Sequence, residues 1–291
     1  MSGLLVFGAP CHAQQTVGWG RLLNNDLLGD LHDRWHSGSY AVSALRGPVW
    51  LGTLPGQLGA LVEFRISGAI LASADLQHPA LDDRRYAAPL SLGLRSHVAW
   101  AGLQASLGAD LVATGPQTGI GHFQSWLHGA LGVAKPDLTD QMDNAFYPTL
   151  QAELGKDLIV NQRLTVHPFV GAEAGIEHLV QAGGDIVIGN YGQGGLLLRD
   201  DTTGQRYLGI AGTGSAMSLT LGGDVAHVFG SAYLPDKGAA SASPTRTRLR
   251  AGLAWSGERA SAFYGVTYLA PEFASQPQGQ MVGSVNLNLR F

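Results

Sequence analysis

The sequence predicts an all-β fold in which antiparallel strands close into a transmembrane β-barrel. Apolar and polar residues alternate through much of the chain, and a period of two is that of a strand with two different faces. Only 14% of the residues are charged, whereas 41 of the 291 are glycine. No apolar run reaches the ~18 residues of a membrane-spanning helix, so strands would have to cross the membrane.

The alternation is clearest in segments of about ten residues separated by turns rich in Gly, Asp and Asn. In the segment VEFRIS, Phe64 and Ile66 alternate with Glu63 and Arg65. The segments with this pattern are 62–67, 90–100, 103–112, 164–176, 217–225, 248–255, 262–269 and 281–291. We expect one face of each strand to contact lipid or a core and the other face to tolerate water.

Soluble β-sandwiches and lipocalin-like barrels alternate in the same way, so a soluble β protein is the alternative. Three features favour the membrane. First, residues 1–13 resemble the end of a signal peptide that is cleaved after Ala13, although a buried N-terminal strand is the other interpretation because basic residues are missing. Second, cleavage removes Cys11, the single cysteine, and with it any disulfide scaffold. Third, the chain ends on an aromatic residue, Phe291, as outer-membrane barrels usually do.

The expected organisation is therefore a signal-peptide remnant over residues 1–13 and one outer-membrane barrel domain over residues 14–291. Trp100, Tyr264 and Tyr268 are placed where aromatic girdles could mark the two membrane interfaces. The net charge of -4 and the absence of a long basic run exclude nucleic-acid binding on electrostatic grounds.

One region departs from the strand pattern. Within residues 115–142, apolar residues recur at helical spacing, and Pro136 ends the pattern. These apolar residues are Ile120, Phe123, Leu127 and Leu131. We expect a short helix in the lumen, at the rim, or over the mouth of the barrel, because irregular backbone cannot face lipid. Residues 199–205 and 238–245 are expected to be loops.

Two polar clusters are candidates for chemistry. The first cluster contains Asn24, Asn25, Asp26, Asp30, His32, Asp33, His36 and Ser37. The second contains Gln124 and His128, which are four residues apart and therefore share a helix face. A histidine can act as a general base near neutral pH, and an Asp beside an amide can hold calcium through oxygen atoms. The two clusters together could hydrolyse an ester by activating water.

Each cluster also has a structural interpretation. A lone histidine on a helix is more often packed or solvated than catalytic, and an Asn-Asp pair is more often a turn than a metal site. His32 and His36 suggest zinc by their spacing, but their surroundings are not helical and no HExxH motif is present. No GxSxG motif marks Ser37 as a nucleophile.

Five ordered motifs resemble those of the outer-membrane lipid A 3'-O-deacylases, the LpxR family. They are NNDLLGDLHDRWHSG at 24–38, DDRRYAAPL at 82–90, GPQTGIGHFQSWLH at 115–128, TDQM at 139–142 and APEFASQPQGQMVGSVNLNLRF at 270–291. The resemblance covers nearly the whole predicted mature chain in order. It implies about twelve antiparallel strands, with the site near the end of the barrel that faces the outer leaflet.

The resemblance also implies an activity and a set of site residues. The activity is that of a calcium-dependent esterase in the bacterial outer membrane, which cleaves the 3'-linked acyloxyacyl group from lipid A, the lipid part of lipopolysaccharide. Separately from the resemblance, we expect a monomer, although the sequence does not determine the oligomeric state. Asn25 and Asp26 match the family's Asn-Asp pair, with Asp26 as the calcium ligand. Ser37 falls where the family has Thr or Ser, His128 falls on the histidine that deprotonates water, and Gln124 would orient the helix or the substrate.

Departures from the family pattern support two further hypotheses. Residues 1–134 contain no lysine, whereas the resemblance implies a functional lysine in this part of the chain. Arg65, Arg84 and Arg85 are candidate replacements, although an arginine is not equivalent to a lysine. Ala88 and Leu138 replace a family Gly and Trp. The second hypothesis is therefore a catalytically impaired barrel with a structural or binding role, and the third is a small-solute pore.

Overall fold

The computed structural model describes residues 15–212, 216–234, 240–257 and 260–289. Four features considered in the sequence lie outside these ranges: the predicted signal peptide, its cleavage point after Ala13, Cys11, and the terminal Phe291.

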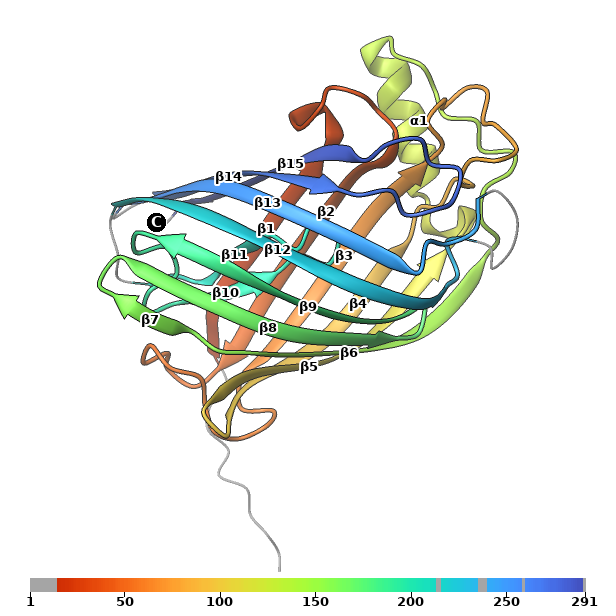
Figure 1. Cartoon of the computed structure of the whole chain (residues 1–291). Coiled ribbons are helices and arrows are strands. Elements are labelled where there is room, and N and C mark those ends of the chain that lie inside the picture. The colour runs from red at the N-terminus through yellow and green to blue at the C-terminus, as the bar shows by residue number, and fades with distance from the viewer. Residues whose placement is uncertain (1–14, 213–215, 235–239, 258–259, 290–291) are drawn as a thin grey trace, which may run out of the picture.

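Within the described ranges, twelve antiparallel strands form a closed barrel (Figure 1). The first strand pairs with the last, as Leu23 lies opposite Val285, and this pairing closes the cylinder. The strands are β1 (Gln15–Asn25), β2 (Trp35–Gly47), β3 (Val62–Ala72), β4 (Leu90–Trp100), β5 (Leu103–Thr114), β6 (Ala145–Gly155), β8 (Leu164–Ala174), β9 (Glu177–Ile188), β12 (Ala216–Ser231), β13 (Thr245–Ser256), β14 (Ala260–Leu269) and β15 (Gln280–Leu289). The short strand β7 (Leu158–Asn161) pairs only with β8, next to β6. The predicted barrel and its strand number are confirmed.

The period of two separates the two faces of the wall. In β3, Glu63 and Arg65 are buried in the interior, whereas Phe64 and Ile66 are 46% and 55% exposed on the outer surface. Trp100, Tyr264 and Tyr268 are also exposed. An outer surface of large apolar side chains around a polar interior is the arrangement of a barrel surrounded by lipid. No helix among the described residues has the length and apolar character needed to cross a membrane.

The predicted helix is present as α1 (Ile120–Leu131), preceded by the 3-10 helix η2 (Pro116–Thr118). Gly119 and Gly132, on either side of α1, both have left-handed backbone conformations, with φ of 72° and 69°. Gly132 therefore ends the helix as a C-terminal cap, and the prediction that Pro136 ends it was wrong by about one helical turn.

Helix α1 lies at the rim of the barrel (Figure 1), and its contacts place its first residue on the outer side of the wall. A Cβ atom built on Gly68 would lie 3.1 Å from the Cδ1 atom of Ile120. Gly68 follows the exposed Ile66 by two residues, so it faces outward as well. Ile120 also packs against a small cluster that includes Ala72 and Tyr86. This position is compatible with lipid because a helix satisfies its own backbone hydrogen bonds.

A two-stranded hairpin fills the opposite end of the lumen. Its strands are β10 (Leu196–Arg199) and β11 (Arg206–Ile210), and Figure 1 shows them inside the cylinder. Leu198 and Tyr207 from the hairpin join Leu22 and Leu45 from the wall in the main hydrophobic core. The predicted loop 199–205 is the turn of this hairpin, with Arg199 as the last residue of β10.

The remaining predicted loop, 238–245, is described only in part. Residues 235–239 lie outside the described ranges, residues 240–244 connect to the wall, and Thr245 begins β13. Ala242 in this connection pairs with Phe273 of another connection at the same end of the barrel. The long connections at the α1 end therefore pack on one another above the lumen.

Candidate active site on the outer face of the rim

The turn after β1 is held to β2 by the side chain of Asn25. Its Oδ1 atom accepts a hydrogen bond of 2.9 Å from the backbone N–H of Leu27, which caps the 3-10 helix η1 (Asp26–Leu28). Its Nδ2 atom donates to the carbonyl oxygen of Ser37, also at 2.9 Å. Asn24 faces the lumen, where it donates to Asp200. Because successive strand residues face opposite sides, Asn25 faces outward.

The η1 turn folds over the rim onto the outside of the wall. A Cβ atom on Gly283 of β15 would lie 2.5 Å from the Cβ atom of Leu28, so a glycine is needed there for the turn to pack. Tyr264, which is exposed on the outer surface, donates a hydrogen bond of 2.8 Å to the carbonyl oxygen of Leu28. The segment after β1 therefore reaches the same outer side of the barrel as α1.

Asp26 is completely buried, and no basic side chain among the described residues pairs with it. One carboxylate oxygen, Oδ2, accepts a hydrogen bond of 2.8 Å from the backbone N–H of Arg34, and the other, Oδ1, has no partner. Burial raises the pKa of Asp26 to about 8, and the nearby Asp33 and Asp30 carboxylates contribute to the rise. Since a buried carboxylate is costly unless a cation neutralises it, this position suits a cation ligand.

His128 lies on the buried face of α1 with one ring nitrogen held by the backbone. Its Nδ1 atom is 2.5 Å from the carbonyl oxygen of Ala134, and a carbonyl can only accept, so Nδ1 carries the proton. The other ring nitrogen, Nε2, lies 3.5 Å from the Oδ2 atom of Asp33. This contact brings α1 to the segment that follows β1. It also turns the Nε2 atom toward that segment.

Gln124, one turn before His128, is also buried. Its Oε1 atom accepts a hydrogen bond of 2.8 Å from the hydroxyl of Tyr86. Tyr86 belongs to the connection between β3 and β4, so this bond fixes the inner face of α1 against the wall. Gln124 thus has a partner that orients the helix, and we expect its role to be positional.

The unpartnered oxygen atoms in the segment from Asp26 to Ser37 fit a hard cation by type. Among the described residues, the buried side-chain oxygens without a hydrogen-bond partner include Asp26 Oδ1, Asp33 Oδ1 and Ser37 Oγ. Calcium prefers carboxylate, hydroxyl and carbonyl oxygens. The described residues contain no group of three or more His, Cys, Asp or Glu side chains that could hold a metal. A cation here would therefore depend on Asp26 together with neutral oxygens such as that of Ser37.

The two histidines near Asp33 in the sequence point to different places. His32 is exposed, and its ring contacts the carbonyl oxygen of Asp30. His36 faces the lumen, where its Nε2 atom lies 2.7 Å from the carboxylate of Glu272. These positions give no support to a zinc site that uses both histidines.

The three candidate replacements for the family lysine all have acidic partners. Arg65 lies in the lumen 2.5 Å from Glu63, and Arg84 lies 3.0 Å from Glu272. Arg85 is half exposed and pairs with Asp140. Among the described residues, none of the three forms a hydrogen bond or ion pair with Asp26 or with His128.

Sequence reasoning missed the groups that hold the site in place. Tyr86 lies within the motif DDRRYAAPL, and its hydroxyl beside the apolar residues 87–90 was the available signal. The carbonyl of Ala134, which orients His128, has no side-chain signal at all. Asp33 belonged to the polar cluster but had no assigned role, because its contact with His128 joins residues 95 positions apart.

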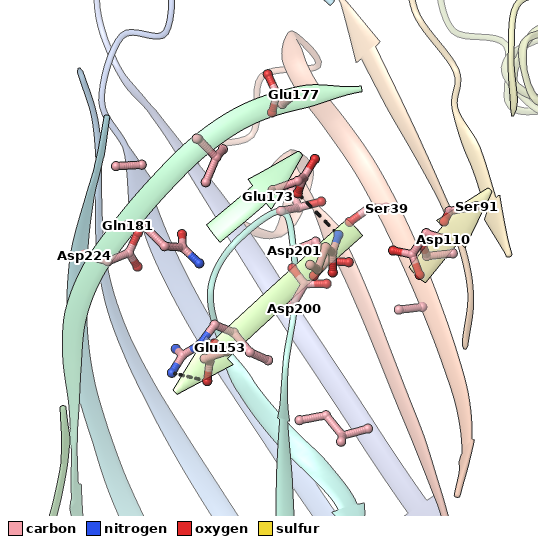
Figure 2. A pocket seen from close by; sticks show the side chains of 18 of the residues that line it. Ser39, Ser91, Asp110, Glu153, Glu173, Glu177, Gln181, Asp200, Asp201 and Asp224 are labelled. Atoms are coloured by element: carbon pink, nitrogen blue, oxygen red, sulfur yellow. Dashed lines mark hydrogen bonds and ion pairs between the residues drawn. The ribbon is translucent and has the colours of Figure 1, made fainter. Parts of the chain in front are cut away.

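A cavity lies elsewhere, inside the lumen. It has a volume of about 280 Å³, and Asn25, Asp26, Ser37, Gln124 and His128 do not line it. Figure 2 shows the carboxylates that surround this space. Most of them have arginine partners: Asp110 with Arg95, Glu153 with Arg199, Glu177 with Arg246, Asp201 with Arg65 and Arg95, and Asp224 with Arg248 and Arg250. We interpret this network as structural.

Comparison with known proteins identifies relatives of this barrel. A family model described as "Outer membrane protein LpxR" matches residues 2–291. The structure of LpxR from Salmonella typhimurium superposes with a TM-score of 0.76 at 18% identity, covering 94% of this chain and 100% of that one.

Other outer-membrane barrels are more distant. The β domain of the Bordetella autotransporter BrkA has a TM-score of 0.45 at 9% identity, covering 94% of this chain and 99% of that one. The KdgM porin has a TM-score of 0.40 at 9% identity, covering 94% and 98%. Comparison with curated protein sequences gives no match. The family match extends over nearly the whole chain, and the barrel fold agrees with it. The chain is therefore an outer-membrane β-barrel protein that belongs to the LpxR family.

Proposed function

We propose that the protein is a calcium-dependent lipid A 3'-O-deacylase that hydrolyses the ester of the 3'-linked acyloxyacyl group at the outer leaflet. The observation that carries the proposal is the 3.5 Å approach of His128 Nε2 to Asp33, which brings a basic nitrogen to the segment containing Asp26. Membership of the LpxR family supports the choice of substrate. The site uses residues of one chain, so the proposed active form is a monomer.

In the proposed reaction, His128 removes a proton from a water molecule through Nε2, and the resulting hydroxide attacks the ester carbonyl carbon. The hydrogen bond from Nδ1 to Ala134 keeps the imidazole in the required tautomer. Asp33 stabilises the imidazolium that forms. The imidazolium then returns its proton to the 3'-oxygen of the sugar as the carbon–oxygen bond breaks, releasing a carboxylic acid and a free hydroxyl group.

Other residues of the site would position the substrate and the cation. Asp26 and Ser37 would hold a calcium ion, which when bound supplies positive charge beside the ester carbonyl oxygen. Asn25 keeps Ser37 near the turn that contains Asp26. Gln124 and Tyr86 hold the face of α1 that carries His128 toward the wall.

The test is mass spectrometry of lipid A from cells that express the wild-type chain or variants. Wild-type cells should lose the 3'-linked chains in the presence of calcium, and His128→Ala should lower the rate by about 10²- to 10⁴-fold. His122→Ala is the matched control, because His122 is an exposed histidine on the same helix. Retention of the 3'-linked chains in wild-type cells at saturating calcium would contradict the proposal.

The second candidate is a catalytically impaired barrel with a structural or binding role. The observation that favours it is the pairing of Arg65, Arg84 and Arg85 with acidic residues. Because these arginines are already paired, they do not take the role of the family lysine. This candidate predicts that lipid A remains fully acylated with both wild-type and His128→Ala protein. It also predicts that purified protein still binds lipid A.

A further inference from the structure

Helix α1 has an unusual distribution of side chains for a segment at a protein surface. Its buried residues are Gly121, Gln124 and His128. Phe123, Trp126 and Leu131 are 58%, 65% and 67% exposed. A helix that faces water would place its polar side chains outward and its apolar side chains inward. The outward face of α1 is therefore built for apolar surroundings.

The position of α1 shows what those surroundings are. The first residue of the helix, Ile120, packs on Gly68 at the outer face of β3. Ile66 lies two residues earlier on the same outer face, and Phe64 lies two residues before that. The exposed side chains of α1 thus continue, at the rim, the apolar surface by which the barrel contacts membrane lipid.

A second apolar group lies on the other side of the candidate site. Leu27, Leu28 and Leu31 are 52%, 39% and 75% exposed in the turn that packs on the outer face of β15. Leu31 also has a φ of 66°, a left-handed conformation that residues other than glycine seldom adopt and that tends to occur at functional sites.

We propose that these two groups dock into the acyl-chain layer of the outer leaflet and admit one lipid chain between them to the site. We call them the acyl-docking surface, which consists of Leu27, Leu28, Leu31, Phe123, Trp126 and Leu131. The proposal rests on the proposed function for its orientation, since it assigns the α1 end to the outer leaflet. It adds that the enzyme takes its substrate directly from the bilayer.

Two features select lipid as the occupant rather than a second copy of the chain. The surface is continuous with the outer wall, which lipid already covers in an outer-membrane barrel. In addition, the polar pair of Asp33 and His128 lies where the turn that carries Leu31 meets α1, so a lipid whose chains enter here presents its ester to that pair. Aromatic residues such as Trp126 are also favoured at the level where acyl chains meet head groups.

The first test uses tryptophan fluorescence and needs no catalysis. The full chain is reconstituted in phosphatidylcholine vesicles with brominated acyl chains, and the signal of Trp126 is obtained as the difference between wild type and Trp126→Phe. We expect bromine near the ester end to quench that signal about twofold or more, as for an interfacial aromatic residue. A signal that brominated lipid does not quench would overturn the proposal.

Two other tryptophans calibrate the measurement. Trp19 is 53% exposed on the outer wall, so the signal removed by Trp19→Phe should be quenched. Trp50 donates a hydrogen bond to the carbonyl oxygen of Gly194 and packs against the core formed by the hairpin. The signal removed by Trp50→Phe should be quenched less than that of Trp126.

The second test separates docking from chemistry. The double variant Phe123→Ser with Trp126→Ser should raise the apparent KM for lipid A in vesicles about tenfold and leave kcat unchanged. The same variant should act normally on lipid A dispersed in detergent micelles. An equal loss on both substrates would contradict docking, because it would indicate damage to the site.

The two tests distinguish failure of the docking proposal from failure of the proposed function. If wild-type protein does not hydrolyse lipid A but Trp126 is quenched, the deacylase function is wrong and the docking surface stands. If sedimentation in detergent shows a dimer that the double variant loses, a second copy occupies this surface, and the docking proposal is overturned.

Discussion

The luminal charges and the outer-face site differ in how their buried carboxylates are neutralised. Glu63 in the lumen is completely buried, with Arg65 at 2.5 Å and His97 at 2.8 Å. Asp26 on the outer face is equally buried, yet among the described residues no basic side chain pairs with it. Both regions contain a buried carboxylate. The outer face is the candidate site because its carboxylate, Asp26, has no basic partner among the described residues.

The histidines of the two regions differ in the same way. In the lumen, His36 and His97 each place Nε2 within 2.8 Å of a carboxylate, so that nitrogen is already occupied. His128 is held through Nδ1 by a backbone carbonyl, and its Nε2 is 3.5 Å from Asp33. The longer distance leaves Nε2 available to a water molecule.

The largest effect is expected when the unpaired carboxylate of Asp26 is removed. We expect Asp26→Asn to abolish calcium binding measured by isothermal titration calorimetry and to lower deacylation by about 10²- to 10³-fold. Because the wild-type carboxylate is buried without a cation, the variant should unfold at no lower urea concentration than the wild type in calcium-free buffer.

The matched control for Asp26 is Asp82→Asn, which alters an exposed carboxylate in a connection at the same end of the barrel. This control should bind calcium and hydrolyse lipid A like the wild type. Unchanged calcium binding in Asp26→Asn would show that the unpaired carboxylate is not a ligand.

Removal of a paired luminal charge should affect stability instead. Glu272 lies 2.7 Å from His36 and 3.0 Å from Arg84. Glu272→Gln leaves both basic groups without this carboxylate, so the free energy of unfolding in urea should fall by about 3 kcal/mol. The control Asp140→Asn breaks a surface pair with Arg85 and should cost less than ~1 kcal/mol.

The contribution of Glu272 to the free energy of unfolding should depend on pH. Burial alone would raise the pKa of Glu272, but His36, Arg246 and Arg84 outweigh it and hold the pKa well below its usual value of 4.5. The stabilisation is therefore fully present above that usual value and is lost as the pH falls through the lower pKa of the folded state. The difference between wild type and Glu272→Gln should shrink at the lowest pH values; a constant difference would contradict this origin.

A smaller loss of activity is expected when Asp33 is changed, and it tests whether Asp33 acts on His128 or on the cation. Asp33→Asn removes the carboxylate 3.5 Å from His128 Nε2, and we expect deacylation to fall about fivefold because the partly exposed pair contributes on the order of 1 kcal/mol. Calcium affinity is measured on the same variant. An equal loss of calcium binding would assign Asp33 to the cation and not to the histidine.

The smallest effect is expected for the hairpin in the lumen. Asp201 pairs with Arg95 at 2.8 Å and with Arg65 at 3.4 Å, but its side chain is 46% exposed. Asp201→Asn should therefore lower the free energy of unfolding by less than ~1 kcal/mol and leave lipid A hydrolysis unchanged. A large loss of activity would mean that the luminal network takes part in the reaction.

The strands of the barrel wall could be predicted from the sequence because the polarity of each residue indicates whether it faces the lumen or the outside. The alternation of Phe64 and Ile66 with Glu63 and Arg65 is a local property, and the structure preserves it. The helix was also local, since Ile120, Phe123 and Leu127 recur at its period. Only its C-terminal end was misplaced, because the cap is Gly132 and not Pro136.

The remaining features depend on contacts between distant segments. Leu196, Leu197 and Leu198 form a short apolar run, and such a run is compatible with a wall strand or with a buried one. That it lies inside the cylinder follows only from its contacts with Leu22 and Leu45. The approach of His128 to Asp33 likewise depends on a contact between distant segments.

The inward hairpin has a consequence for the cell that carries this protein. A cylinder of this many strands with an empty interior would be a channel for small solutes. With β11 packed against β1 and β2, and with Leu198 of β10 in the same hydrophobic core, the hairpin occupies part of this lumen. We therefore expect the hairpin to restrict the passage of small solutes through the barrel, so that conductance steps should be absent in planar bilayers.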